Sequence, residues 1–190
     1  MSDRLKKDKS IILYVLYFIL SLAILLFWLS FIYGMSAKTG EESSGLSYEI
    51  TEYVYSLPVA PHKSSFDRVH LFIRKTAHFA EYGFLSLFIV NFLNSCRVIW
   101  NGRKLIKKSF RNGKNTGYMI AVSMLFCGIY ASLDEYHQSF VDGRESCVWD
   151  VGIDIAGACT FMFFLWLCYW LWGKRKGCRK QMSEPAKRIN

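Results

Sequence analysis

What the sequence lacks excludes several classes of protein. Its six cysteines form no Cys-x-x-Cys pair, and Cys127, Cys159 and Cys168 lie inside apolar runs, so we interpret them as small core or lipid-facing residues and not as a disulfide framework. Basic residues outnumber acidic ones by 24 to 15, yet no stacking or groove-reading motif accompanies them, so nucleic acid is not an expected partner. The sequence also has no internal repeat.

Charge is missing from long stretches of the chain, and this absence predicts membrane spans. Hydrophobic residues make up 52% of the sequence, and no charged residue occurs in residues 11–35. That run exceeds the roughly 7–15 apolar residues of a signal peptide and the roughly 20 residues that cross a bilayer, so it is expected to be an uncleaved anchor. Further apolar runs predict spans at about residues 76–96, 117–133 and 148–172.

The basic residues gather beside these spans and predict the topology. Four Lys or Arg residues precede the first span, seven lie between the second and third, and seven follow the fourth. The positive-inside rule then places both termini in the cytoplasm. We expect an all-α, polytopic membrane helix bundle: a cytoplasmic N-terminus (1–10), a four-span domain (11–172) and a basic cytoplasmic tail (173–190).

The connection after the first span contains a segment typical of a helix start. Gly40-Glu41-Glu42-Ser43-Ser44 is rich in capping residues, and apolar residues follow it at helical spacing until Pro58. A short helix lying on the membrane surface and an ordered loop packed on the spans both fit this pattern.

Ionisable residues within the spans are the main functional signal, because charge in a membrane segment is costly. Arg74, His78 and Glu81 share one helix face at the outer end of the second span, and Asp150 and Asp154 share one at the outer end of the fourth. Glu81 and Asp154 are each expected roughly 8–9 Å below their helix ends. The outer connection adds polar residues, so one outer pocket is predicted from Arg74, Lys75, His78, Glu81, Asp134, Glu135, His137, Gln138, Arg144, Asp150 and Asp154.

Several kinds of chemistry fit this set of residues. Arg74 and Arg144 suit the binding of a phosphate or carboxylate. Hydrolysis or transfer on a phosphorylated lipid is the alternative, with a histidine as nucleophile or general acid/base and a carboxylate beside it. The candidate catalytic residues are His78, Glu81, Asp134, His137, Asp150 and Asp154. A metal site built from His78, Glu81, His137 and an aspartate is a weaker interpretation, because neither His-x-x-Glu nor the Asp-Glu segment has a recognised ligand spacing.

A structural interpretation stands beside the functional ones. Ion pairs such as Arg144 with Asp150, or Arg74 with Glu81, would pin the outer helix ends together without binding any ligand. A transporter would need polar residues that continue into the cytoplasmic half, where only Asn91 and Asn94 are evident.

The charged residues follow a pattern that resembles the VanZ-like family of bacterial membrane proteins. The pattern reads Arg74-Lys75-x-Ala77-His78-Phe79-x-Glu81-Tyr82, then Asp134-Glu135-x-His137-Gln138-x-Phe140-Val141-x-Gly143-Arg144, then Asp150-Val151-x-x-Asp154-x-x-Gly157. The Gly40–Ser44 segment is also similar to many members. Asp142 departs from the family, where proline is usual before the Gly-Arg pair.

The resemblance implies a role in the envelope, since the family is named for a protein that accompanies glycopeptide-resistance genes and lowers susceptibility to teicoplanin. The resemblance supplies no settled reaction, and it leaves any cofactor unknown. We therefore expect a multi-pass protein of the bacterial cytoplasmic membrane. Its expected partners are membrane lipids and a lipid-linked cell-wall precursor or glycopeptide, recognised through an anionic group.

The topology predicts a labelling pattern for two cysteines. A membrane-impermeant thiol reagent applied to intact cells should label Cys147, which is expected outside, and spare Cys178 in the basic tail. Permeabilised cells, in which both thiols are reached, provide the control. Labelling of Cys178 with sparing of Cys147 on intact cells would show that the topology is the reverse of the one predicted.

Overall fold

The computed structural model describes residues 2–57, 65–101, 113–144 and 146–182, and this part of the chain forms helices and no strands. The helices are α1 (Ser2–Ser36), α2 (Gly40–Ser56), α3 (Phe66–Asn101), α5 (Gly113–Gln138) and α6 (Val148–Met182). All but α2 are long and apolar enough to cross a membrane. The prediction of an all-helical protein with four spans is confirmed.

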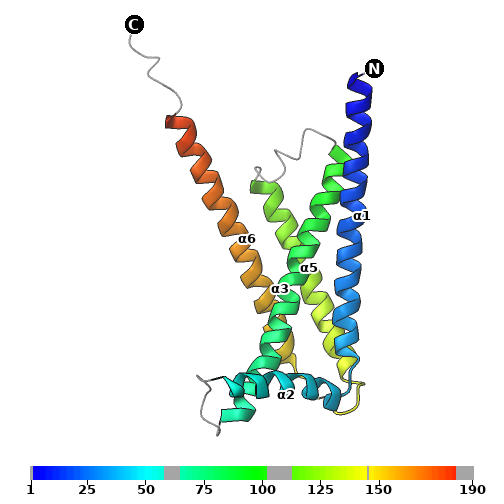
Figure 1. Cartoon of the computed structure of the whole chain (residues 1–190), viewed down its shortest axis with the longest axis vertical. Coiled ribbons are helices and arrows are strands. Elements are labelled where there is room, and N and C mark those ends of the chain that lie inside the picture. Colours follow the sequence, from blue (N-terminus) through cyan, green and yellow to red (C-terminus); the bar gives the residue numbers. More distant parts are fainter. Residues whose placement is uncertain (1, 58–64, 102–112, 145, 183–190) are drawn as a thin grey trace.

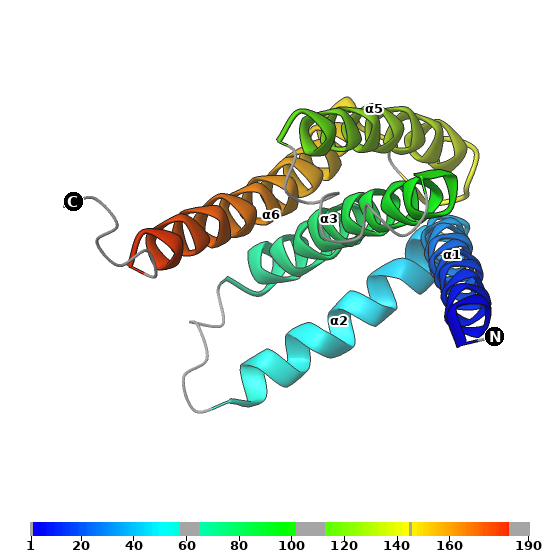
Figure 2. The same ribbon diagram turned by 90° about the horizontal axis from the view of Figure 1, so that it is seen from above.

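Helix α3 is the centre of the bundle. It packs against α1, α5 and α6 and also contacts α2. Figure 1 shows that α1 begins and α6 ends at the same end of the bundle, while α2 lies across the opposite end. Seen from above, α2 runs beside α3, and α6 diverges from α1 toward its C-terminal end (Figure 2). The end of the bundle that α2 covers is called the α2 end below.

All four spanning helices extend beyond the spans predicted from the sequence, and two of the extensions bear on the site. Helix α3 begins at Phe66, well before the predicted start at residue 76, and α5 continues to Gln138 instead of ending at residue 133. Hydropathy marks only the apolar part of a helix, whereas the backbone can continue its hydrogen bonds into polar residues. The placement of Asp134, Glu135, His137 and Gln138 in a connecting segment was therefore wrong, because these residues belong to α5.

Helix α2 settles the open question about the segment after the first span in favour of a helix. Thr39 and Glu42 form a capping box: the Glu42 amide donates to Thr39 Oγ1 at 3.3 Å, and the Thr39 amide donates to Glu42 Oε2 at 3.1 Å. Ser47 Oγ of α2 lies 2.9 Å from Nε2 of His70, which belongs to α3. The capping box starts α2, and the contact with His70 holds it along α3.

The spanning helices approach closely through small and polar residues. Ser21 Oγ donates to Ser95 Oγ at 2.6 Å, and Tyr17 Oη donates to Asn91 Oδ1 at 2.8 Å, which joins α1 to α3. Between α3 and α6 the backbones meet at Gly157, where an added Cβ would lie 2.0 Å from the carbonyl oxygen of Phe79. Small residues and interhelical hydrogen bonds of this kind are the usual means of packing helices in lipid.

The contact at Gly157 predicts a specific loss of stability. Gly157→Ala should lower the free energy of unfolding by about 1–3 kcal/mol, because the new methyl group meets backbone that cannot move aside. Gly152→Ala on the same helix is the matched control, since a Cβ there meets nothing within 4 Å. Thermal unfolding of the purified variants in detergent measures the difference, and equal melting temperatures would contradict it.

Candidate functional site

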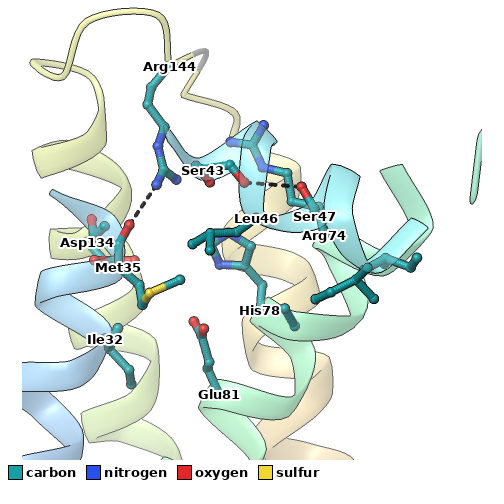
Figure 3. Close-up of a pocket in the computed structure, with 14 residues that line it drawn as sticks. Ile32, Met35, Ser43, Leu46, Ser47, Arg74, His78, Glu81, Asp134 and Arg144 are labelled. Atoms are coloured by element: carbon teal, nitrogen blue, oxygen red, sulfur yellow. Dashed lines mark hydrogen bonds between the residues drawn. The ribbon is translucent and has the colours of Figure 1, made fainter. Parts of the chain in front are cut away.

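A cavity of about 110 Å³ lies at the α2 end of the bundle. Its walls come from α1, α2 and α3, with contributions from α5 and from the segment before α6 (Figure 3). Its ionisable lining residues are Arg74, His78, Glu81, Asp134 and Arg144. The remaining lining residues are Ile32, Met35, Ser36, Ser43, Leu46, Ser47, Ile50, Ile73 and Ala77. The cavity is thus lined by both charged and apolar side chains.

Arg74, His78 and Glu81 reach the cavity from successive turns of α3. Their spacing of four and three residues places them on one helix face. Figure 3 shows Arg74 near α2 and the Glu81 carboxylate pointing into the cavity from its far end. Across residues 2–57, 65–101, 113–144 and 146–182, no hydrogen bond or ion pair engages the side chain of Arg74 or Glu81. These two side chains are available to a ligand.

Arg144 is engaged by the protein itself. Its Nη2 donates to the Met35 carbonyl at 2.7 Å, its Nε to the Lys38 carbonyl at 3.1 Å, and its Nη1 to Gln138 Oε1 at 3.0 Å. Burial and the nearby Arg74 guanidinium lower the pKa of Arg144 from its ordinary value, while Asp134 raises it. Arg144 therefore ties the C-terminal end of α1 to α5, and its main contribution is to hold the cavity in shape.

A glycine contact completes this connection. The Gly40 amide donates to the Asp142 carbonyl at 3.0 Å, and a Cβ on Gly40 would lie 1.9 Å from the Gly143 carbonyl oxygen. Gly143 has a φ of 71°, in the left-handed region that favours glycine. The bond uses the carbonyl group of residue 142, which proline would also supply, so Asp142 keeps this link between α2 and the segment before α6.

Asp134 and Gln138 extend the connection into the cavity wall. Gln138 Nε2 donates to Asp134 Oδ2 at 3.0 Å, while its Oε1 accepts from Arg144. Asp134 and Gln138 are both buried. A buried polar chain of this kind is stable only when each member has a partner, and this one holds Asp134 in a fixed position.

His78 and Asp154 form a second buried group behind the cavity. His78 Nδ1 lies 3.7 Å from Asp154 Oδ1, and the side chains of Tyr82 and Asp154 are 0% and 1% exposed. In the described part of the chain, His78 Nδ1, Tyr82 Oη and Asp154 Oδ1 have no hydrogen-bond partner. Unsatisfied buried polar atoms are rare in native structures, so each of these three calls for an explanation, and a catalytic or binding role is one. His78 also lines the cavity, and its Nδ1 is buried, so Nε2 is the nitrogen that can face a ligand.

The nearest ionisable neighbour of Asp154 on α3 is His78. The sequence predicted similar depths for Glu81 and Asp154 below their helix ends, but α3 begins so early that Glu81 lies about four turns into it.

The other predicted site residues lie outside the cavity. Lys75 forms an ion pair with Asp150, and Glu135 accepts a hydrogen bond from the Cys147 amide. His137 Nδ1 lies 3.4 Å from Ser36 Oγ, and its ring is 5.0 Å from that of Tyr33, measured between centroids. Pinning of helix ends does occur, through Lys75 with Asp150. Neither Arg144 with Asp150 nor Arg74 with Glu81 is an ion pair within the described ranges.

No group of three or more His, Cys, Asp or Glu side chains is placed to hold a metal ion in the part of the chain that the structure describes. The interpretation that combined His78, Glu81 and His137 in one metal site does not match their positions, because His137 packs against α1 and does not line the cavity.

Sequence reasoning missed the contribution of α2 to the cavity. Ser43, Leu46, Ser47 and Ile50 all line it, and Tyr82 belongs to the buried group with His78. The signal for α2 was present in its capping box and in the helical spacing of its apolar residues. Nothing in the sequence shows that this helix turns back over α3.

One family model matches most of the chain. The family is described as VanZ/LLP1, and the match covers residues 14–171, which include all the lining residues of the cavity. No curated protein and no solved structure matches the chain significantly.

The contacts of Arg144 predict the effect of a conservative substitution. Arg144→Lys keeps the positive charge but cannot reach all three acceptors, so the segment of residues 139–144 and the start of α2 should loosen. Hydrogen exchange at the amide of Gly40 and at the amides of residues 139–144 should become faster by about tenfold or more. Arg68→Lys is the control, because Arg68 is an exposed residue of α3 that does not line the cavity. Unchanged protection in Arg144→Lys would show that other contacts hold the segment.

Proposed function

The chain belongs to the VanZ/LLP1 family, and from that premise we propose that it is a bacterial envelope protein that lowers glycopeptide susceptibility, teicoplanin included. It does so by recognising an anionic group of a lipid-linked molecule or cell-wall precursor. The cavity at the α2 end is the proposed binding site. The observation that carries the proposal is the free Arg74 guanidinium in a cavity formed by four helices.

The chemistry of the cavity supports an anionic ligand group. A guanidinium binds phosphate and carboxylate through paired hydrogen bonds, and Arg74 has no competing partner among the described residues. His78 adds a further polar atom one turn deeper, and Ser43 and Ser47 add hydroxyl groups from α2. Ile32, Met35, Leu46 and Ile50 offer an apolar surface to the rest of the molecule.

The position of the cavity supports a ligand that reaches it from the membrane. The cavity lies at one end of four helices that are long and apolar enough to span a bilayer. The basic segments favour the opposite end as the cytoplasmic one, which puts the cavity in the outer leaflet of the cytoplasmic membrane. Lipid-linked precursors of the cell wall are exposed at that face.

A second candidate function is hydrolysis or transfer on a phosphorylated lipid, and the pair of His78 with Asp154 favours it. A carboxylate beside one imidazole nitrogen leaves the other nitrogen to act as a base toward an attacking water, or as a nucleophile toward a bound phosphate. Release of inorganic phosphate from a polyprenyl phosphate, lost in Asp154→Asn, is the observation that would favour catalysis over binding alone.

The proposal predicts that Arg74 and Glu81 are needed for reduced susceptibility. At matched protein levels, cells that express Arg74→Gln or Glu81→Gln should regain most of the teicoplanin susceptibility that wild type removes, because each change deletes a cavity charge without a large change in volume. The readout is the minimal inhibitory concentration. Arg68→Gln provides the control, since Arg68 is exposed on α3 and does not line the cavity. If both cavity variants protect as well as wild type, the cavity is not the site.

A further inference from the structure

We propose that the head group bound in this cavity carries a primary ammonium beside its phosphate, so that the ligand is an amine-bearing phospholipid and not an enclosed glycopeptide. This inference rests on the proposed function and narrows its ligand class. It depends on the size of the cavity and on the two charged side chains, Arg74 and Glu81, that line it without a partner among the described residues.

The size of the cavity limits what can enter. Pockets that enclose a drug-sized molecule occupy about 300–1,000 Å³, whereas this cavity measures about 110 Å³. A lipid head group of a few heavy atoms fits such a space. A glycopeptide, or the saccharide and peptide of a cell-wall precursor, does not. Whatever else the ligand contains remains outside the cavity.

The charges that line the cavity require a partner of each sign. Asp134 and Arg144 are joined through Gln138, which leaves Arg74 and Glu81 as the two charged lining residues without a hydrogen bond or ion pair inside the described ranges. A phosphate satisfies Arg74 but cannot donate to the Glu81 carboxylate, and its negative charge would repel that group. A phosphate with an ammonium satisfies both residues and adds no net charge to the membrane interior.

Arg74 and Glu81 lie at different depths in the cavity. Figure 3 shows Arg74 beside α2 and Glu81 at the far end of the cavity. In an ethanolamine phospholipid the ammonium and the phosphate are neighbouring groups, so one head group offers a partner to both residues.

Native mass spectrometry of the full-length protein with lipids of identical acyl chains tests the inference. Phosphatidylethanolamine should bind about tenfold more tightly than phosphatidylglycerol, which lacks the ammonium, and than phosphatidylcholine, whose cation cannot donate a hydrogen bond. Glu81→Gln should remove this preference, and Arg74→Gln should weaken all three lipids. Arg68→Gln should behave as wild type. The comparison of lipids on wild-type protein needs no variant to fold.

The outcomes separate this inference from the proposed function. Binding of phosphatidylglycerol or of undecaprenyl phosphate as tight as that of phosphatidylethanolamine, with dependence on Arg74, would overturn the inference and leave an anion-binding site. Binding of teicoplanin in place of every lipid would overturn it as well. If neither a lipid nor teicoplanin binds in an Arg74-dependent way, both the inference and the proposed function fail.

Discussion

The guanidinium of Arg144 is the contact on which the α2 end of the bundle depends. It donates to carbonyls of Met35 and Lys38 at the C-terminal end of α1 and to Gln138 at the end of α5. Those carbonyls lack helical partners of their own, and a cation there also interacts favourably with the negative end of the helix dipole. One side chain thus joins the C-terminal end of α1 to Gln138 of α5, and its segment meets Gly40, where α2 begins, at Gly143. This connection fixes the start of α2, while the contact between Ser47 and His70 holds α2 along α3.

The polar residues of the α2 end divide into two groups by their partners. Asp150, Glu135 and Asp134 each have a partner within the protein, namely Lys75, the Cys147 amide and Gln138. Such partners offset the cost of placing a charge between membrane helices.

Arg74, Glu81, His78 and Asp154 have no hydrogen-bonded partner among the described residues, and all four lie in or directly behind the cavity. A structural role explains the first group. It does not explain the second, because buried polar groups without a hydrogen bond cost stability unless something else uses them, and His78 and Asp154 approach each other only to 3.7 Å.

The sequence was sufficient to predict the spans and the face of α3 that carries Arg74, His78 and Glu81, since both follow from the spacing of apolar and charged residues. Its predictions failed where a choice depended on positions in space. Asp150 was paired with Arg144 from the sequence, but the packing of α3 against α6 brings Lys75 to it instead. His137 was grouped with His78 because both are histidines near charged residues, but its position on α5 directs it toward Ser36. Helix ends in polar sequence were also missed, because hydropathy does not mark them.

A small cavity is compatible with an effect on a large antibiotic. Under the function proposed above, the protein would act through the lipids that surround the drug's membrane-anchored target and would not need to enclose the drug. The size of the cavity supports that proposal, because Arg74 and Glu81 line a space of about 110 Å³, well below the roughly 300–1,000 Å³ that encloses a drug-sized molecule.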